Sequence, residues 1–311
     1  MTAAVAGHHD RRVQTGRGEV VRPAFWIAAL FVGVALVIGL PLDGPTARLI
    51  ATGVFVVGGM PHGAYDIALL SRATRLGRRG LGLALGGYIA IAAAMAALWV
   101  VAPLLALVLF LIVASVHFGE DWTMIEEPLF RVAAGTAILA APAISHFDEV
   151  ARLFVAMSGT PYGATVARAL IAVAPVALLV TIVGIATAWR DGARAWAVAT
   201  TVAIAGLIVA PPVAGFALFF VFLHSPRHFA EAGTVLHGRS RGWWMATGAL
   251  MSAAAILGWV LFATLLRDRL TPDDTAQAFQ LLATVAVPHL VFSRWIERRL
   301  ARDGHASSND R

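Results

Sequence analysis

The sequence contains no cysteine, and all 24 of its basic residues are arginine, so lysine is absent too. Without thiols there are no disulfides and no thiolate metal sites, and any metal ion must be held by His, Asp or Glu. Without lysine amines, Schiff-base chemistry with a carbonyl substrate is excluded. Charged residues are scarce as well, at 14% against 59% hydrophobic residues. That is more apolar surface than one soluble core can bury, and it predicts a polytopic membrane protein.

Apolar runs between charges and Pro or Gly breaks predict an all-α fold, a transmembrane helix bundle of about ten spans. The expected spans are residues 25–42, 48–70, 82–101, 103–118, 131–145, 164–188, 195–210, 212–229, 243–266 and 276–293. With the N-terminus placed inside, 19 of the 24 Arg residues fall on the inner side. The positive-inside rule therefore predicts a multi-pass inner-membrane protein with both termini cytoplasmic. The net positive charge serves this orientation and implies no nucleic-acid partner.

The chain is expected to hold one membrane domain between two Arg-rich cytoplasmic tails. The tails are residues 1–24 and 294–311, and the transmembrane catalytic domain is residues 25–293. The first apolar run follows a long charged stretch and leads into Leu40-Pro41-Leu42-Asp43, which is unlike a cleavable signal peptide, so an uncleaved first span is expected. No convincing internal repeat is present, which disfavours a transporter built from two matching halves.

Half of the ten histidines fall in or at the ends of expected spans. These are His62, His117, His224, His228 and His289, whereas His8, His9, His146, His237 and His305 are expected at the surface. Counted from the outer span starts at about 1.5 Å per residue, four of the five share a depth of about 20 Å. Polar side chains in hydrocarbon are costly and by default functional. We therefore expect a shared metal ion, with separate structural roles as the alternative.

His224 and His228 are four residues apart, so both rings can point from one helix face at a single atom. Pro226 lies between them and is expected to bend the helix. Taken alone, the pair fits two interpretations equally well. The two histidines could bind one metal ion, or one could lie at a helix end while the other faces water. An HExxH motif is absent, which disfavours a zinc protease. With only one HxxxH pair, a single centre of three or four neutral imidazoles is expected, and imidazole suits Zn, Cu, Fe and Ni alike.

Most of these histidines carry an acidic residue about one helical turn further on. The candidates are Asp66 after His62, Glu120 and Asp121 after His117, and Glu231 after His228. Such a carboxylate can orient the imidazole by accepting its remote N–H, or it can itself bind the metal.

Four motifs together resemble the Brp/Blh family of membrane β-carotene 15,15′-dioxygenases between about residues 48 and 293. The motifs are Pro61-His62-Gly63-Ala64 with Asp66, His117-Phe118-Gly119-Glu120-Asp121, His224-Ser225-Pro226-Arg227-His228, and Val287-Pro288-His289. The resemblance implies a polytopic enzyme that uses Fe(2+) and O2 to cleave β-carotene centrally into two all-trans retinals, which serve microbial rhodopsins. It implies His62, His117, His224 and His228 as iron ligands and catalytic residues. His289 is then a further site residue outside that set.

The predicted depth of the histidines agrees with this expectation. A C40 hydrocarbon dissolves in the bilayer, so an enzyme that acts on it benefits from an active site at membrane depth. The alternatives are another membrane metal-dependent oxidoreductase, a carotenoid-cleaving enzyme with a different substrate, and a membrane transporter. A haem protein would use two axial histidines and leave three unexplained. The sequence does not fix the oligomeric state.

Overall fold

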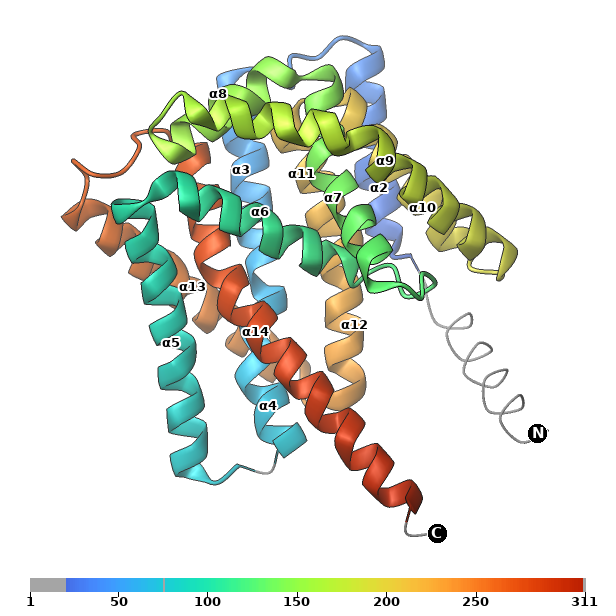
Figure 1. The fold of residues 1–311 in the computed structure, drawn as a ribbon, viewed down its shortest axis with the longest axis vertical. Coiled ribbons are helices and arrows are strands. Elements are labelled where there is room, and N and C mark those ends of the chain that lie inside the picture. Colours follow the sequence, from blue (N-terminus) through green and yellow to red (C-terminus); the bar gives the residue numbers. More distant parts are fainter. Residues whose placement is uncertain (1–20, 75, 310–311) are drawn as a thin grey trace.

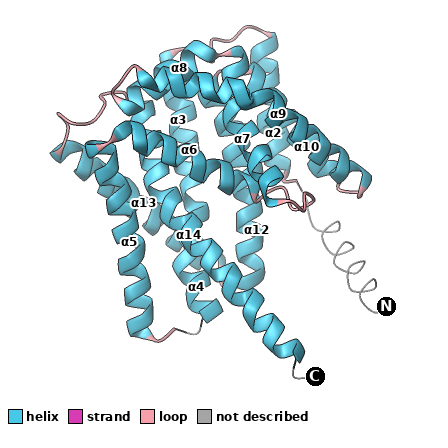
Figure 2. Cartoon of the chain, in the orientation of Figure 1, coloured by secondary structure: helices cyan, strands magenta, loops and turns pink. Residues whose placement is uncertain are grey.

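The computed structural model describes residues 21–74 and 76–309, with the side chains of His62, Ala73 and residues 296–309 outside the description. Within these ranges every regular element is a helix, which confirms the all-α expectation (Figure 2). The first 20 residues of the predicted N-terminal tail lie outside the described residues. At the other end, the last helix continues past residue 293, where the second tail was expected to begin.

The elements follow one another with short connections (Figure 1). They are α2 (Pro23–Val37), α3 (Pro45–Gly59), the 3-10 helix η1 (Met60–Tyr65), α4 (Asp66–Thr74), α5 (Arg78–Val101), α6 (Pro103–Gly119), α7 (Pro128–Ser145), α8 (Phe147–Ser158), α9 (Tyr162–Arg190), α10 (Arg194–Val209), α11 (Pro212–Phe219), the π-helix η2 (Phe220–His224), α12 (Ser225–Val235), α13 (Arg241–Leu265) and α14 (Asp274–Asn309). Proline occupies the first turn of α2, α3, α6, α7 and α11, where its missing N–H costs no hydrogen bond.

Seven described helical segments are long and apolar enough to cross a membrane, judged by length and composition. They are Pro45–Arg72, Arg78–Val101, Pro128–Ser145, Tyr162–Arg190, Pro212–Val235, Arg241–Leu265 and Asp274–Trp295, and three shorter apolar helices are Pro23–Val37, Pro103–Gly119 and Arg194–Val209. Each expected span coincides with one of these segments. The number of crossings and the cytoplasmic position of the termini stay predictions.

Helix α8 was not predicted from the sequence. Asp148, Glu149 and Arg152 interrupt the apolar pattern in this region, so no span was expected between residues 145 and 164. The helix is amphipathic and buries Val150 and Phe154 among the neighbouring helices. A buried stripe on one face is enough to hold such a short helix against the bundle.

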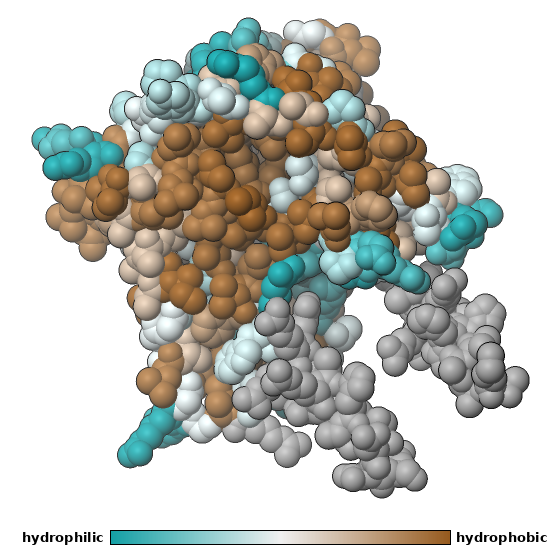
Figure 3. All heavy atoms as spheres, in the orientation of Figure 1, coloured by the Kyte–Doolittle hydropathy of each residue, from teal (hydrophilic) through white to brown (hydrophobic). Residues whose placement is uncertain are grey.

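The outer surface of the bundle is largely apolar. Figure 3 shows a broad hydrophobic face with polar residues gathered at its upper and lower edges. Large exposed apolar side chains on α5 and α6 include Leu83, Ile89, Val101, Leu105 and Ile112. A soluble monomer rarely exposes so extensive an apolar surface, whereas helices that face lipid do.

Close packing of α6 against α7 fixes the end of α6 that carries His117. A Cβ atom at Gly135 of α7 would overlap the carbonyl oxygen of Ser115 on α6. Similarly, a Cβ at Gly119 of α6 would lie 2.6 Å from the carbonyl oxygen of Arg131. Small residues at such crossings let two backbones approach within a membrane bundle. The position of His117 therefore depends on these two glycines.

Candidate metal centre

The first two imidazoles of the candidate centre come from the junction of η2 and α12. Pro226 has no N–H to continue the α-helical pattern. Just before it, the chain widens into the π-helix η2, in which the Ser225 N–H bonds to the carbonyl of Phe220. The Ser225 hydroxyl donates to the same carbonyl over 2.7 Å. A π turn thus leads into the pair of histidines, and the rings of His224 and His228 lie with their centroids 4.5 Å apart.

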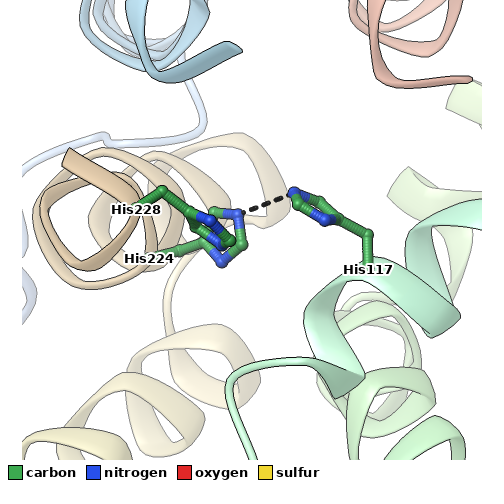
Figure 4. A group of neighbouring side chains, drawn as sticks. All are labelled: His117, His224 and His228. Carbon is green, nitrogen blue, oxygen red and sulfur yellow. Dashed lines mark hydrogen bonds between the residues drawn. The ribbon is translucent and has the colours of Figure 1, made fainter. Parts of the chain in front are cut away.

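His117, near the C-terminal end of α6, faces this pair (Figure 4). Its Nε2 lies 3.1 Å from Nε2 of His224, and its ring centroid lies 5.1 Å from that of His228. One ligand atom from each of the three histidines can be chosen so that all lie within 4.8 Å of one another. His117 and His224 are buried and His228 is half-buried. Three neutral imidazoles at this spacing fit a single metal ion.

A fourth imidazole, His289 of α14, lies beside these three. Its ring centroid is 5.0 Å from that of His117 and 6.2 Å from that of His228. Four of the five span histidines therefore come together, and three of them, His117, His224 and His289, are among the four expected at a shared depth. The backbone of His62 lies in η1, but its side chain is outside the described residues.

Three carboxylates contact the Nδ1 atoms of three of these rings. Glu120 lies 3.1 Å from Nδ1 of His117, Asp121 lies 2.7 Å from Nδ1 of His224, and the two oxygens of Asp66 lie 2.8 and 2.9 Å from Nδ1 of His289. An ionised carboxylate only accepts, so we infer that each Nδ1 donates and each Nε2 presents a lone pair. The Nε2 atoms of His117 and His224 face each other at 3.1 Å, so either a proton between them or a metal ion beside both satisfies their lone pairs. This donor set fits a metal ion.

Two of these carboxylates contact imidazoles on other elements, and the expected pairing of Asp66 with His62 stays a prediction because the His62 side chain lies outside the described residues. Asp66, expected to act with His62 one turn earlier, contacts His289 on a different helix. Asp121, four residues after His117, contacts His224 instead. Spacing along one helix reveals only neighbours on that helix, whereas both of these pairs bridge separate elements.

The other two acidic candidates differ in how closely they approach their rings. Glu120 contacts His117 as its i,i+3 spacing predicted. Glu231 instead accepts a hydrogen bond from Arg227 and lies 3.7 Å from Nδ1 of His228, beyond hydrogen-bond length. Its side chain is 58% exposed, so it is the least constrained of the four candidate acids.

Three further residues around the centre were not singled out from the sequence. The Tyr88 hydroxyl of α5 donates to Asp66 over 3.2 Å, and Arg294 of α14 donates to Glu120 over 3.2 Å. Arg227 donates to the backbone carbonyl of Asp121. A signal existed for Tyr88, because it is one of only three tyrosines and its hydroxyl lies within an apolar span. The two arginines look like ordinary boundary charges in the sequence.

The two acids in the connection between α6 and α7 are affected by burial. Burial raises the pKa of the Asp121 carboxyl to about 6, although the positive charge of Arg227 acts in the opposite direction. Burial also raises the pKa of Glu120, and Arg294 opposes this shift. The arginines therefore help to keep both carboxylates ionised as acceptors for the imidazoles.

Aromatic side chains enclose the rings on the side of the bundle core. Phe118, Phe216, Phe219 and Phe220 are all buried. The ring of Phe220 stacks on His224 with centroids 5.6 Å apart, and Phe118 meets His224 edge-on at 5.0 Å. This packing restricts the rotamers of the imidazoles and keeps bulk water away from that side of the centre.

Comparisons with known proteins identify one family. The family described as beta-carotene 15,15'-dioxygenase matches residues 53–297. The chain is 28% identical over 331 residues to the probable beta-carotene 15,15'-dioxygenase Blh of Halobacterium salinarum, covering 91% of this chain and 94% of that protein. It is 26% identical over 264 residues to the beta-carotene 15,15'-dioxygenase of an uncultured marine bacterium, 66A03, covering 80% and 93%. No solved structure matches the chain.

Proposed function

The chain belongs to the β-carotene 15,15′-dioxygenase family, and from this premise we propose that it cleaves β-carotene to retinal at an iron centre held by histidines. The enzyme is a membrane protein and a carotenoid-cleaving dioxygenase. The observation that carries the assignment of the centre is the convergence of His117, His224 and His228 among apolar helices.

We assign His117, His224 and His228 as iron ligands on this geometry, and His62 as a fourth on its place in the family's motif. His62 follows Met60 and Pro61 in η1, and Gly63 of the same segment packs against His289. His289 is assigned as a neighbouring site residue, held by Asp66. Neutral imidazoles leave the full charge of an Fe(2+) ion uncompensated, and fewer than six protein ligands leave positions open.

The reaction is balanced without an external reductant. The central C15–C15′ double bond and the O–O bond break, and two C=O bonds form, one on each retinal. Iron held by these residues would supply the binding and activation of O2. The protein's own residues orient the imidazoles through Glu120, Asp121 and Asp66, exclude water through the surrounding phenylalanines, and place the polyene. No side chain needs to act as a general acid or base.

The remaining assignments follow from this activity. We propose that O2 is the co-substrate, that the carotenoid is taken from membrane lipid, and that the protein is a multi-pass protein of the inner membrane. The chain has no lysine and cannot itself hold retinal as a Schiff base. We propose that the product leaves the protein and that a microbial rhodopsin receives it.

The proposed activity is tested by expressing the chain in a bacterial host that accumulates β-carotene. We expect the cells to bleach and to contain retinal, whereas cells with the empty vector stay coloured. The visible spectrum of the purified protein separates two classes of enzyme: a Soret band would identify haem and contradict the histidine-held iron centre. A colourless protein with bound iron and retinal as product supports the proposal.

Removing the charge of a carboxylate that holds an imidazole should weaken iron retention. Asp66→Asn and Glu120→Gln are each expected to lower iron affinity on the order of 10- to 100-fold, because such partners fix the ring and raise its basicity. Iron per chain after dialysis against a graded series of chelator concentrations measures this. Glu127→Gln, an exposed acid in the same connection, is the matched control. Iron retention equal to wild type in both variants would remove this role from Asp66 and Glu120.

A further inference from the structure

One apolar cavity lies on each side of η1, and residues of both η1 and α13 border each of the two cavities. The α12-side cavity has a volume of about 890 Å³ and is bordered by Pro61, Tyr65, Phe229, Gly248 and Ala249, among others. The α5-side cavity has a volume of about 610 Å³ and is bordered by Met60, Gly63, Ala92, Ala255 and Trp259, among others. Both volumes lie in the range of about 300–1,000 Å³ that is typical of small-molecule sites.

Ser252 of α13 borders both cavities. Its Oγ is buried and has no hydrogen-bond partner among the described residues. A serine in a helix usually donates to the carbonyl four residues earlier, so a buried hydroxyl without this bond is unusual. This shared border thus carries a polar group that the protein itself does not satisfy.

The α5-side cavity also adjoins the space beside the imidazoles. Met60 and Gly63, which border the α5-side cavity, also border a small space of about 30 Å³ that His117 and His289 line. A Cβ atom at Gly63 would lie only 3.4 Å from Nδ1 of His289. The segment η1, which carries His62, therefore borders both cavities and also the space beside the imidazoles.

The combined length of the cavities suits an extended polyene. Along α13 they are bordered from Trp244 to Phe262, which at about 1.5 Å per residue spans about 27 Å. That is the length scale of a C40 carotenoid and well beyond that of one retinal. Exposed apolar residues border each cavity, including Val57 and Met245 on the α12 side and Ile89 on the α5 side. Both cavities consequently open toward the lipid-facing surface.

Building on the proposed function, we propose that these cavities form one carotenoid channel, with one half of the extended hydrocarbon in each. The middle of a symmetric polyene then lies over η1, beside the imidazoles, while its two ring ends lie in separate apolar chambers. The channel explains selection of the central bond, because the two chambers position both halves relative to the centre. Helix α13 forms its outer wall, and of its residues only Gly248 and Trp259 are buried.

The channel is tested by filling it at three positions. Ser252→Phe fills the border shared by both cavities, Ala92→Phe the α5-side cavity and Ala249→Phe the α12-side cavity. Ala94→Phe and Ala246→Phe are matched controls on the same two helices, at exposed positions that border neither cavity. The measurement is β-carotene bound per chain in detergent-purified, iron-stripped protein, read from its visible absorption, so that it does not depend on turnover.

Each filling variant is expected to bind at least about tenfold less β-carotene than wild type, because a bulky ring removes the apolar space that the polyene occupies. The controls should bind as wild type does. If Ser252→Phe does not fold, the two alanine variants decide the question. Wild-type binding in the folded filling variants would overturn the channel, and so would cavities that retain phospholipid and exclude β-carotene.

The outcome for the channel is distinguishable from that for the proposed function. If wild-type protein binds β-carotene, the filling variants do not, and no retinal forms with iron and O2, the channel stands and the dioxygenase assignment fails. If retinal forms at wild-type rates in all folded filling variants, the activity stands and the channel fails.

Discussion

Replacing His117, His224, His228 or His62 by alanine is expected to reduce retinal formation to the background level while leaving the protein in the membrane. Each variant removes one imidazole from a buried set of neutral donors, and the remaining ligands cannot hold Fe(2+) with the same affinity. Retinal extracted from β-carotene-accumulating cells and iron per purified chain should fall together. The effect is expected to be the largest of any single substitution in the chain.

His146→Ala is the matched control for these variants. His146 lies between α7 and α8, where it pairs with Glu149 and the carbonyl of Val209, and it takes no part in the imidazole cluster. Its replacement should leave retinal formation and iron content close to those of wild type. Full activity in any two of the four ligand variants would reject the proposed ligand set.

Gly135→Ala is expected to destabilise the protein and to lower its iron content, although Gly135 does not contact an imidazole ring. The added Cβ would overlap the carbonyl oxygen of Ser115, so α6 and α7 must move apart near the end of α6 that carries His117. Overpacking of this kind typically costs about 1–3 kcal/mol. The measurements are the midpoint of thermal unfolding in detergent and the iron bound per chain.

Gly86→Ala provides the control for this prediction. Gly86 lies on α5, and a Cβ atom there would meet nothing within 4 Å. Alanine also has the higher helix propensity, so this variant should be as stable as wild type or slightly more so. If Gly135→Ala unfolds at the same midpoint as Gly86→Ala and keeps its iron, close packing of α6 and α7 does not position His117.

The helical elements could largely be predicted from the sequence because apolar runs and prolines mark them. Pro45, Pro103, Pro128 and Pro212 each lie in the first turn of a helix. Helix α8 escaped this reading, since three charged side chains cover its outer face and only a narrow apolar stripe is buried. The 3-10 helix η1 beside Pro61 and the π-helix η2 before Pro226 could not be predicted from the sequence. A proline disrupts the α-helical hydrogen bonds but does not determine which other helical geometry replaces them.

Only part of the centre's surroundings could be predicted. The pairing of Glu120 with His117 follows from spacing on one helix, as does the proximity of His224 and His228. The contacts of Asp66 with His289 and of Asp121 with His224 join residues 223 and 103 positions apart. Such pairs depend on how helices pack, and periodicity along one chain segment carries no information about them.

The most direct test is the joint stoichiometry of metal and product in purified wild-type enzyme. The protein is loaded with Fe(2+) without oxygen, freed of excess metal, and then mixed with β-carotene and O2. The histidine-held iron centre predicts one iron per chain and two retinals for every β-carotene consumed. Protein that binds no iron, or that consumes β-carotene without forming retinal, would contradict it.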